Sequence, residues 1–295
     1  MITRRKAITT AMGAAGAGLA ALAGMPPPAT AEGELAAASP WSVGLGARMR
    51  LVRGARLGDS QANGAGIEIA LDPGYKTYWR MPGEAGVPPA FEWSRSRNLA
   101  SVTPAWPAPR RFDEGGASVI GYAGDNVVLP LRIAASDASA PVWLEVSLTY
   151  AACNIICVPE HADAALVLRQ DAPDGLYAAL IEAAAREIPR RLEAAALGLD
   201  RPRSVRLSLA PGRKGLALRP QLGDHERILD MFVEGPENWL FGAPKAVPGG
   251  AADEVGLPLV DHPKWVDRTA EIPFTLTILT DLRAVETTIA ARPVG

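Results

Sequence analysis

The sequence predicts an all-β protein built from two β-sandwiches with a helical linker between them. From about residue 40 to residue 168, short runs that alternate apolar and polar residues are separated by turn-forming stretches such as Asp72-Pro73-Gly74. The same pattern resumes at Ser204, and only the stretch from Gly175 to Leu199 has apolar residues near helical spacing. Many short strands at regular intervals, with no helical period among them, are typical of β-sandwiches.

Residues 1–31 are predicted to form a signal peptide that is removed from the mature chain. Arg4-Arg5-Lys6 provides a positive start, an apolar stretch without acidic residues follows, and Ala29-Thr30-Ala31 offers a cleavage site before Glu32. A membrane anchor is the alternative, but the apolar run is rich in Ala and Gly and is followed by three prolines. The start also resembles a twin-arginine export signal with Ala7 where Phe is usual, so the Sec and twin-arginine routes both stay open.

The length and charge of the mature chain limit the kinds of protein to which it can belong. Cleavage after Ala31 leaves 264 residues, which is about right for two domains. The mature chain has 27 basic and 32 acidic residues, and this net charge of −5 argues against nucleic-acid binding, which needs a basic face. No later segment has about twenty uninterrupted apolar residues, so we expect no membrane insertion of the mature chain. We also expect no cofactor, and the two cysteines suit an oxidising compartment.

Residues 38–170 are predicted to form the first sandwich. Trp79, Trp93, Trp106 and Trp143 are expected to supply part of its core, and an aromatic platform that binds sugars is the alternative. The expected strands are Ala47–Leu57, Gly66–Leu71, Lys76–Arg80, Ala90–Trp93, Ser101–Trp106, Ser118–Tyr122, Asn126–Ile133, Val142–Tyr150 and Val158–Leu168.

Cys153 and Cys157 are the only cysteines, and three residues separate them. Strand-like runs precede and follow them, so the pair is expected at the mouth of a β-hairpin, close enough to form a disulfide. So short a ring restricts the unfolded chain little: the chain-entropy estimate is roughly 2 kcal/mol, against about 4.7 kcal/mol for a loop of a hundred residues. The spacing therefore favours a redox function, with a structural staple and metal ligation as alternatives.

Dithiol–disulfide exchange needs one thiolate that attacks a partner's disulfide and a second thiol that resolves the mixed intermediate. Cys153 and Cys157 meet this minimum, although no Lys or Arg lies within three residues of either one to lower a thiol pKa. His161 is either a base for this chemistry or an ordinary solvated residue. The competing hypotheses are copper or zinc binding by the cysteines with His161, and a disulfide-stapled interaction module without enzymatic activity.

Residues 171–200 are predicted to be a helical linker. Leu176, Leu180 and Ile188 recur near helical spacing, and Pro189 must kink or divide the segment into one or two helices. The helical segment is expected to pack on the first sandwich, and binding to a partner is the alternative.

Residues 201–295 are predicted to form a second, smaller sandwich. This region contains no cysteine, so docking or spacing is its expected role. The expected strands are Val205–Leu209, Gly215–Leu218, Ile228–Val233, Pro273–Leu279 and Val285–Ile289.

Several segments, in this order along the chain, resemble the DsbD N-terminal domain family of thiol:disulfide interchange proteins. Phe232–Trp239 further resembles the second module of the related ScsB periplasmic region. The DsbD-like segments are Tyr75–Pro89, Trp106–Phe112, Ile120-Gly121-Tyr122, Val128–Leu131 and Tyr150-x-x-Cys153-x-x-x-Cys157-x-Pro159.

The resemblance implies an immunoglobulin-like sandwich whose catalytic residues are Cys153 and Cys157, with protein-disulfide-reductase-like activity in the periplasm. It implies that electrons pass between a thioredoxin-like protein or a membrane-bound thiol reductase and periplasmic thiol proteins. The second family cysteine forms the intermolecular bond, which assigns exchange with partners to Cys157 and resolution to Cys153.

Two departures from the best-known branch of the family change these expectations. That branch has five residues between its cysteines, whereas this chain has three. It also covers the pair with a cap loop that carries an aromatic residue. The equivalent stretch here is expected at Phe112–Ala117, where glycines replace bulk, and either Phe112 or Tyr122 is a candidate for the cover. An ordinary exposed turn is the alternative for this stretch.

The export prediction is tested by the N-terminus of the mature protein. Protein recovered from the periplasm is expected to begin at Glu32, because Ala29-Thr30-Ala31 satisfies the small-residue rule for cleavage. A protein that begins at Met1 in the membrane fraction would contradict it. Unimpaired export after changing Arg4 and Arg5 to Lys would exclude strict dependence on the twin-arginine route.

Overall fold

The computed structural model describes residues 36–54, 64–124, 126–169, 172 and 175–294. The predicted signal peptide, residues 1–31, lies outside the described residues. In the described part of the chain, strands dominate and the helices are one α-helix and one 3-10 helix, which confirms the predicted all-β class. None of the helices found there is long and apolar enough to cross a membrane.

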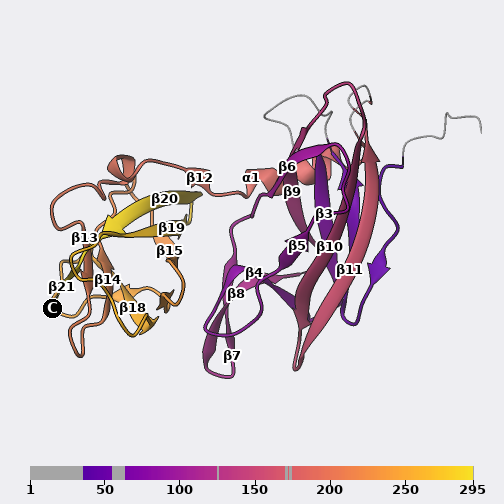
Figure 1. The fold of residues 1–295 in the computed structure, drawn as a ribbon. Coiled ribbons are helices and arrows are strands. Elements are labelled where there is room, and N and C mark those ends of the chain that lie inside the picture. Colours follow the sequence, from indigo (N-terminus) through magenta and orange to yellow (C-terminus); the bar gives the residue numbers. More distant parts are fainter. Residues whose placement is uncertain (1–35, 55–63, 125, 170–171, 173–174, 295) are drawn as a thin grey trace, which may run out of the picture. The chain divides into compact units, whose positions relative to one another are not determined.

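The first sandwich consists of two antiparallel sheets (Figure 1). One sheet has the order β1-β2-β3-β9-β6, with β1 at Ser42–Val43, β2 at Ala47–Arg53, β3 at Ala65–Leu71, β6 at Leu99–Pro104 and β9 at Asn126–Ala135. The other has the order β11-β10-β4-β8-β7, with β5 paired to β10, and comprises β4 at Lys76–Gly83, β5 at Ala90–Glu92, β7 at Arg110–Glu114, β8 at Ala117–Ala123, β10 at Val142–Cys153 and β11 at Cys157–Leu168.

The core of this sandwich follows from the period-2 geometry of its strands. On β10, the even-numbered residues from Val142 to Ala152 are all buried in the main core, where β2, β3, β9 and β11 supply the remaining side chains. Each fully buried Val, Leu or Ile contributes about 1.5–3 kcal/mol of transfer free energy. The odd-numbered residues of β10 lie on the opposite face of the same sheet.

This alternation corrects the prediction that all four tryptophans supply the core. Trp143 occupies an odd position on β10, is 47% exposed, and packs its ring 4.6 Å from the Arg97 guanidinium. Trp93 and Trp106 pack against the main core as expected. Trp79 is fully buried, but in a separate cluster with Ile120 and Phe232.

The helix α1 (Ala178–Arg186) is shorter than the predicted helical stretch. It ends before Ile188 because a residue that precedes a proline is driven out of the helical conformation. Its one fully buried side chain, Ile181, packs against Val52 and Val128 on the outer face of the β1-β2-β3-β9-β6 sheet. The prediction of a helix packed on the first sandwich is therefore confirmed.

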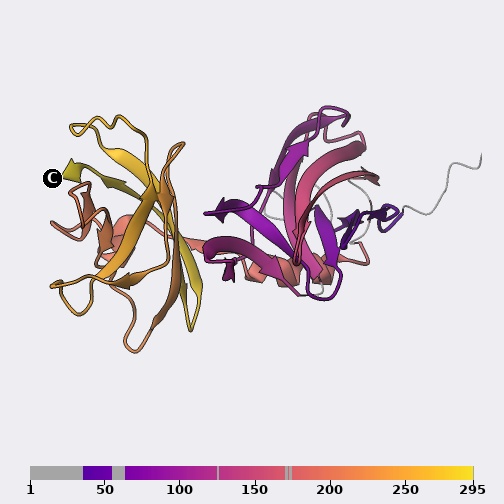
Figure 2. The ribbon, with the colours of Figure 1, turned by 90° about the horizontal axis from the view of Figure 1, so that it is seen from below.

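The second sandwich also contains two sheets (Figure 2) and a core of its own, to which Leu197 and Leu199 contribute. One sheet has the order β12-β20-β19-β15, with β12 at Arg190–Arg191, β15 at Ile228–Glu234, β19 at Ile272–Thr280 and β20 at Ala284–Ala291. The other has the order β16-β18-β14-β13-β21, with β17 paired to β18, and comprises β13 at Val205–Ser208, β14 at Gly215–Leu218, β16 at Leu240–Phe241, β17 at Lys245–Ala246, β18 at Val255–Asp261 and β21 at Pro293–Val294; the 3-10 helix η1 spans Ala194–Leu197.

The expected strands of the second region are all present, and the structure adds others. Strand β18 escaped prediction because Gly256 and Pro258 interrupt its apolar run, and both residues are rare inside strands. The remaining additions are two-residue strands that carry no periodicity.

A strand also replaces the loop expected at Phe112–Ala117. Residues Arg110–Glu114 form β7, which pairs with β8 from Arg110↔Gly121 to Glu114↔Ala117. Gly115 and Gly116 close the hairpin with φ values of 64° and 90°, a region that favours glycine. The glycines that the sequence analysis placed in a cap loop therefore form the turn of a β-hairpin.

We propose that residues 38–170 form an independent folding unit, because the main core draws only on side chains between Ala47 and Leu168. A fragment of these residues is expected to unfold cooperatively in urea. It should be less stable than the full chain by about 1–3 kcal/mol, since the fully buried Trp79 loses its contact with Phe232. A fragment without a cooperative transition by circular dichroism would contradict the proposal.

Candidate functional site

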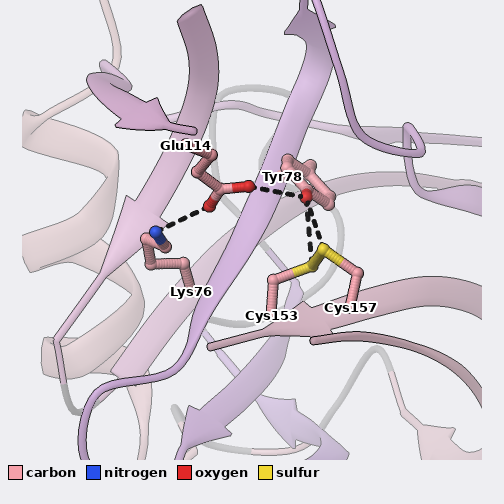
Figure 3. The surroundings of a disulfide bond; sticks show 5 residues. All are labelled: Lys76, Tyr78, Glu114, Cys153 and Cys157. Atoms are coloured by element: carbon pink, nitrogen blue, oxygen red, sulfur yellow. Dashed lines mark hydrogen bonds and ion pairs between the residues drawn. A yellow bond between two sulfur atoms is a disulfide. The ribbon is translucent and has the colours of Figure 1, made fainter. Parts of the chain in front are cut away.

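The two cysteines face each other at the end of the longest hairpin of the first sandwich. Strands β10 and β11 pair without a break from Val142↔Leu168 to Cys153↔Cys157, and residues 154–156 form the turn. The Cα atoms of the cysteines are 4.0 Å apart and their sulfurs form a disulfide (Figure 3). The predicted hairpin and the predicted ability of the pair to form a disulfide are both confirmed.

Strand parity places the disulfide outside the main core. Cys153 occupies an odd position on β10, so its side chain lies on the face opposite Tyr150 and Ala152. A small apolar cluster covers it there, formed with Tyr78, Val119 and Ala151. The site is therefore built on the outer face of a sheet whose inner face is the core.

The two cysteines differ sharply in exposure. Cys153 has no solvent-accessible surface, whereas Cys157 is exposed. A thiol buried among apolar groups resists ionisation, and an exposed one is open to a partner. The two residues before Cys157 are strongly exposed, Ile155 at 96% and Ile156 at 74%.

The hydroxyl of Tyr78 touches both sulfurs of the disulfide. Tyr78 Oη lies 3.0 Å from Cys153 Sγ, 3.0 Å from Cys157 Sγ and 3.4 Å from Glu114 Oε2 (Figure 3). The other carboxylate oxygen of Glu114 is 2.6 Å from Lys76 Nζ. These contacts connect the disulfide to one carboxylate and one ammonium group through a single phenol.

Backbone pairing brings these groups together from distant parts of the chain. On β4, Lys76 pairs directly with Cys153 of β10, and Tyr78 follows two residues later on the same strand. Glu114 is the last residue of β7, which β8 connects to β4. The cation that the sequence lacks near the cysteines is thus supplied by a neighbouring strand.

Burial and Glu114 determine the ionisation of Tyr78. Desolvation, followed by the charge of Glu114 and its hydrogen bond, raises the pKa of Tyr78 to about 12. The phenol therefore keeps its proton throughout the physiological range and acts as a hydrogen-bond donor. A disulfide has no S–H, so this single proton is shared among the Glu114 carboxylate and two weak sulfur acceptors.

The structure distinguishes between the two candidates for the aromatic cover. Phe112 of β7 packs against the cluster that contains Cys153, and Lys76 Nζ lies 5.5 Å from the centre of its ring. Tyr122 instead packs against the main core and donates its hydroxyl to the Pro107 carbonyl. Of the two candidates, Phe112 is therefore the one that packs against the cluster around Cys153.

His161 lies too far along β11 to act on the cysteines. It pairs with Thr149, four residue pairs from the disulfide, which is about 13 Å at the usual rise of a strand. Its ring contacts Ser147 and Thr149. Within the described residues, no group of three or more His, Cys, Asp or Glu side chains is arranged to hold a metal ion, so the proposed copper or zinc site is not assembled.

Of the predicted site residues, the structure brings together Cys153, Cys157 and Phe112. Sequence reasoning missed Tyr78, Glu114 and Lys76 as site residues. Tyr78 and Lys76 lie within the segment Tyr75–Pro89 that carries the family resemblance, so that resemblance was an available signal. Glu114 lies in the stretch expected to be the cap.

Comparison with known proteins agrees with this geometry. Residues 50–169 match the family described as thiol:disulfide interchange protein DsbD, N-terminal. The crystal structure of the N-terminal periplasmic domain of ScsB from Proteus mirabilis superposes with a TM-score of 0.61 and 23% identity, over 87% of this chain and 98% of that chain. At this identity the likeness shows the fold.

A chimeric titin Z1Z2 chain aligns with 10% identity over 88% of this chain and 97% of that chain, but its TM-score of 0.17 carries no structural argument. No curated protein sequence matches the chain. The family match confirms the predicted resemblance: residues 50–169, which hold the disulfide and the Tyr78–Glu114 contact, are similar to the N-terminal domain of DsbD thiol:disulfide interchange proteins.

Proposed function

We propose that the protein is a periplasmic thiol:disulfide exchange protein that relays electrons from a thioredoxin-like donor to periplasmic client proteins. The observation that carries this proposal is a disulfide with one buried and one exposed sulfur, both in contact with a protonated phenol. A periplasmic location is proposed from the predicted signal peptide and from the ScsB relative.

The exchange proceeds in balanced steps on the two cysteines. A donor thiolate attacks Cys157 Sγ, the Cys153–Cys157 bond breaks, and Cys153 leaves as the thiolate and takes up a proton. The donor's second thiol then attacks the donor sulfur that is bound to Cys157 and releases Cys157 as a thiolate. The donor is thereby oxidised to a disulfide, and both cysteines of this chain are reduced. The Cys157 thiolate next attacks a client disulfide and releases one client sulfur as a thiolate. The Cys153 thiolate then attacks Cys157 Sγ, which releases the second client sulfur, so the client is reduced and the Cys153–Cys157 disulfide is restored.

Tyr78 supports this cycle by donating a hydrogen bond to the atom on which negative charge develops. When Cys157 is a thiolate, the phenol donates to it in a charge-assisted hydrogen bond, which contributes about 1.5–3 kcal/mol. When Cys157 carries its proton, the phenol donates to Glu114 instead. The ammonium of Lys76 offsets the repulsion between the Glu114 carboxylate and the thiolate.

The exposed turn between the cysteines is the proposed contact surface for the donor. Ile155 and Ile156 present apolar side chains beside the attackable sulfur, and exposed apolar groups of this kind mark interaction sites. Their burial by an apolar rim around the donor's own cysteines would stabilise the mixed disulfide during exchange.

The cysteine roles are tested by trapping. Cys153→Ser is expected to accumulate a mixed disulfide with a thioredoxin-like protein, visible on non-reducing gels and lost on reduction, because the Cys157 thiolate attacks the disulfide of the oxidised partner and no thiol remains at position 153 to resolve the product. Cys157→Ser should accumulate much less, since Cys153 is buried. Adding Ile155→Ser to the Cys153→Ser protein should lower the trapped yield.

Equal trapping by the two cysteine variants would overturn the assignment of roles. Trapping by neither variant would count against exchange, and a reduction potential far below about −300 mV would then indicate a structural staple.

Tyr78 and Glu114 are expected to shift the pKa of Cys157 in opposite directions. Tyr78→Phe removes the donor to the thiolate and should raise this pKa by about 1–2 units, since one unit corresponds to 1.36 kcal/mol. Glu114→Gln removes a neighbouring negative charge and a competing acceptor, so it should lower the same pKa. The measurement is the pH dependence of alkylation of the reduced protein by iodoacetamide, with Cys153→Ser as the background so that only Cys157 reacts. Shifts of the same sign would contradict the proposed role of the network.

A further inference from the structure

Strand β15 of the second sandwich shows two faces of different character. Met231 and Val233 belong to the second core, as strand alternation requires. Asp230, Phe232 and Glu234 lie on the opposite face, and all three contact residues of the first sandwich. This face contacts two strands of the redox domain, β4 and β7.

The contact with β7 is made through Arg111. Its guanidinium donates to the Asp230 carboxylate at 3.0, 3.1 and 3.3 Å, and to the Met231 carbonyl at 2.9 Å. It also donates to Ser118 Oγ on β8 and lies 5.0 Å from the centre of the Phe232 ring. The Arg111 and Asp230 side chains are only 14% and 16% exposed, so this pair is shielded from much of the screening that weakens surface ion pairs.

The contact with β4 is made through Trp79 and Arg80, the two residues that follow Tyr78. The ring centres of Trp79 and Phe232 are 5.8 Å apart, and both side chains are fully buried. Arg80 donates to both carboxylate oxygens of Glu234, at 2.8 and 2.6 Å, and to Glu286 at 2.5 Å. Burial alone would lower the pKa of Arg80, but the hydrogen bonds to these carboxylates raise it.

These contacts lie close in sequence to the groups that face the disulfide. Arg111 directly precedes Phe112, which packs against the cluster around Cys153, and is three residues from Glu114. Trp79 directly follows Tyr78. The strand that carries the carboxylate and the strand that carries the phenol are thus each held against β15.

We propose that the second sandwich positions the redox site, with Arg111 and Asp230 acting as positioning residues through Glu114 and Phe112. This inference rests on the proposed exchange role of Cys157. It gives the second sandwich a part in setting the reactivity of a cysteine that it does not contain.

The sign of the effect follows from the contacts at the site. The β7–β8 hairpin ends in two glycines with open space around them, so its tip has little packing of its own. Without the clamp at Arg111, the hairpin moves away from Tyr78 and Glu114 loses its share of the phenol proton. Tyr78 then donates fully to the Cys157 thiolate, the carboxylate lies further away, and the pKa of Cys157 falls.

The test uses two substitutions that differ in their effect on charge. Asp230→Asn removes a negative charge, whereas Arg111→Lys keeps the positive charge and loses the two-pronged geometry. Both are introduced into the full chain carrying Cys153→Ser, and alkylation by iodoacetamide is followed against pH. Both should lower the pKa of Cys157 and speed alkylation at pH 7 by about two- to fivefold.

Asp253→Asn is the matched control, because Asp253 forms an exposed ion pair with Arg219 elsewhere on the second sandwich. It should leave alkylation unchanged. In a Glu114→Gln background, Asp230→Asn and Arg111→Lys should have little further effect, since the group through which they act is gone. Circular dichroism confirms that each variant is folded.

Unchanged alkylation in both variants would overturn the proposal, as would an effect that persists undiminished in the Glu114→Gln background. A response to Asp230→Asn alone would indicate a through-space charge effect instead of positioning, and would also overturn it. Alkylation needs no protein partner, so a failure of the exchange hypothesis in trapping is distinguishable from a failure of this one.

Discussion

The site depends on the register between β10 and β11. Twelve consecutive residue pairs align these strands, and the last pair is Cys153 with Cys157. A slip of one residue would move every side chain of a strand to the other face of the sheet. It would put Trp143 into the core, take Leu144 out of it, and separate the cysteines. The apolar residues that fill the core therefore also hold the two sulfurs opposite each other.

With the register set, the neighbouring strands decide how the two sulfurs differ. Strand β4 brings Tyr78 and Lys76 to the cysteines, and β7 brings Phe112 and Glu114. Cys153 is fully buried, whereas exposed Cys157 lies within hydrogen-bond distance of the Tyr78 hydroxyl. Because one hydroxyl proton has several competing acceptors, the proposed exchange role makes the reactivity of Cys157 sensitive to small displacements of β7.

This sensitivity is why the contacts of β15 matter. The face of β15 that carries Asp230, Phe232 and Glu234 satisfies two arginines of the first sandwich and buries a tryptophan. Breaking a largely buried ion pair by removing one partner is costly, so these contacts resist separation. The first sandwich is thus packed on two sides: its own core lies on the inner face of the sheet, and the second sandwich contacts β4 and β7.

Local patterns in the sequence determined the class of the fold, most strands and the hairpin around the cysteines. These features depend on residues close together in the chain, where periodicity and turn chemistry act directly. The same patterns placed Trp143 in the core, because a large aromatic residue is usually buried. Its odd position on β10 puts it on the opposite face of the sheet. They also gave a loop where β7 lies, since five residues ending in Asp113-Glu114 before two glycines carry little strand signal. Only the tertiary structure decided that Tyr78, Glu114 and Lys76 surround the disulfide and that β15 contacts their strands. Those contacts join residues separated by 36 to 154 positions, and such pairings arise from the order of strands in the sheets and from packing across them, which no short stretch of sequence encodes.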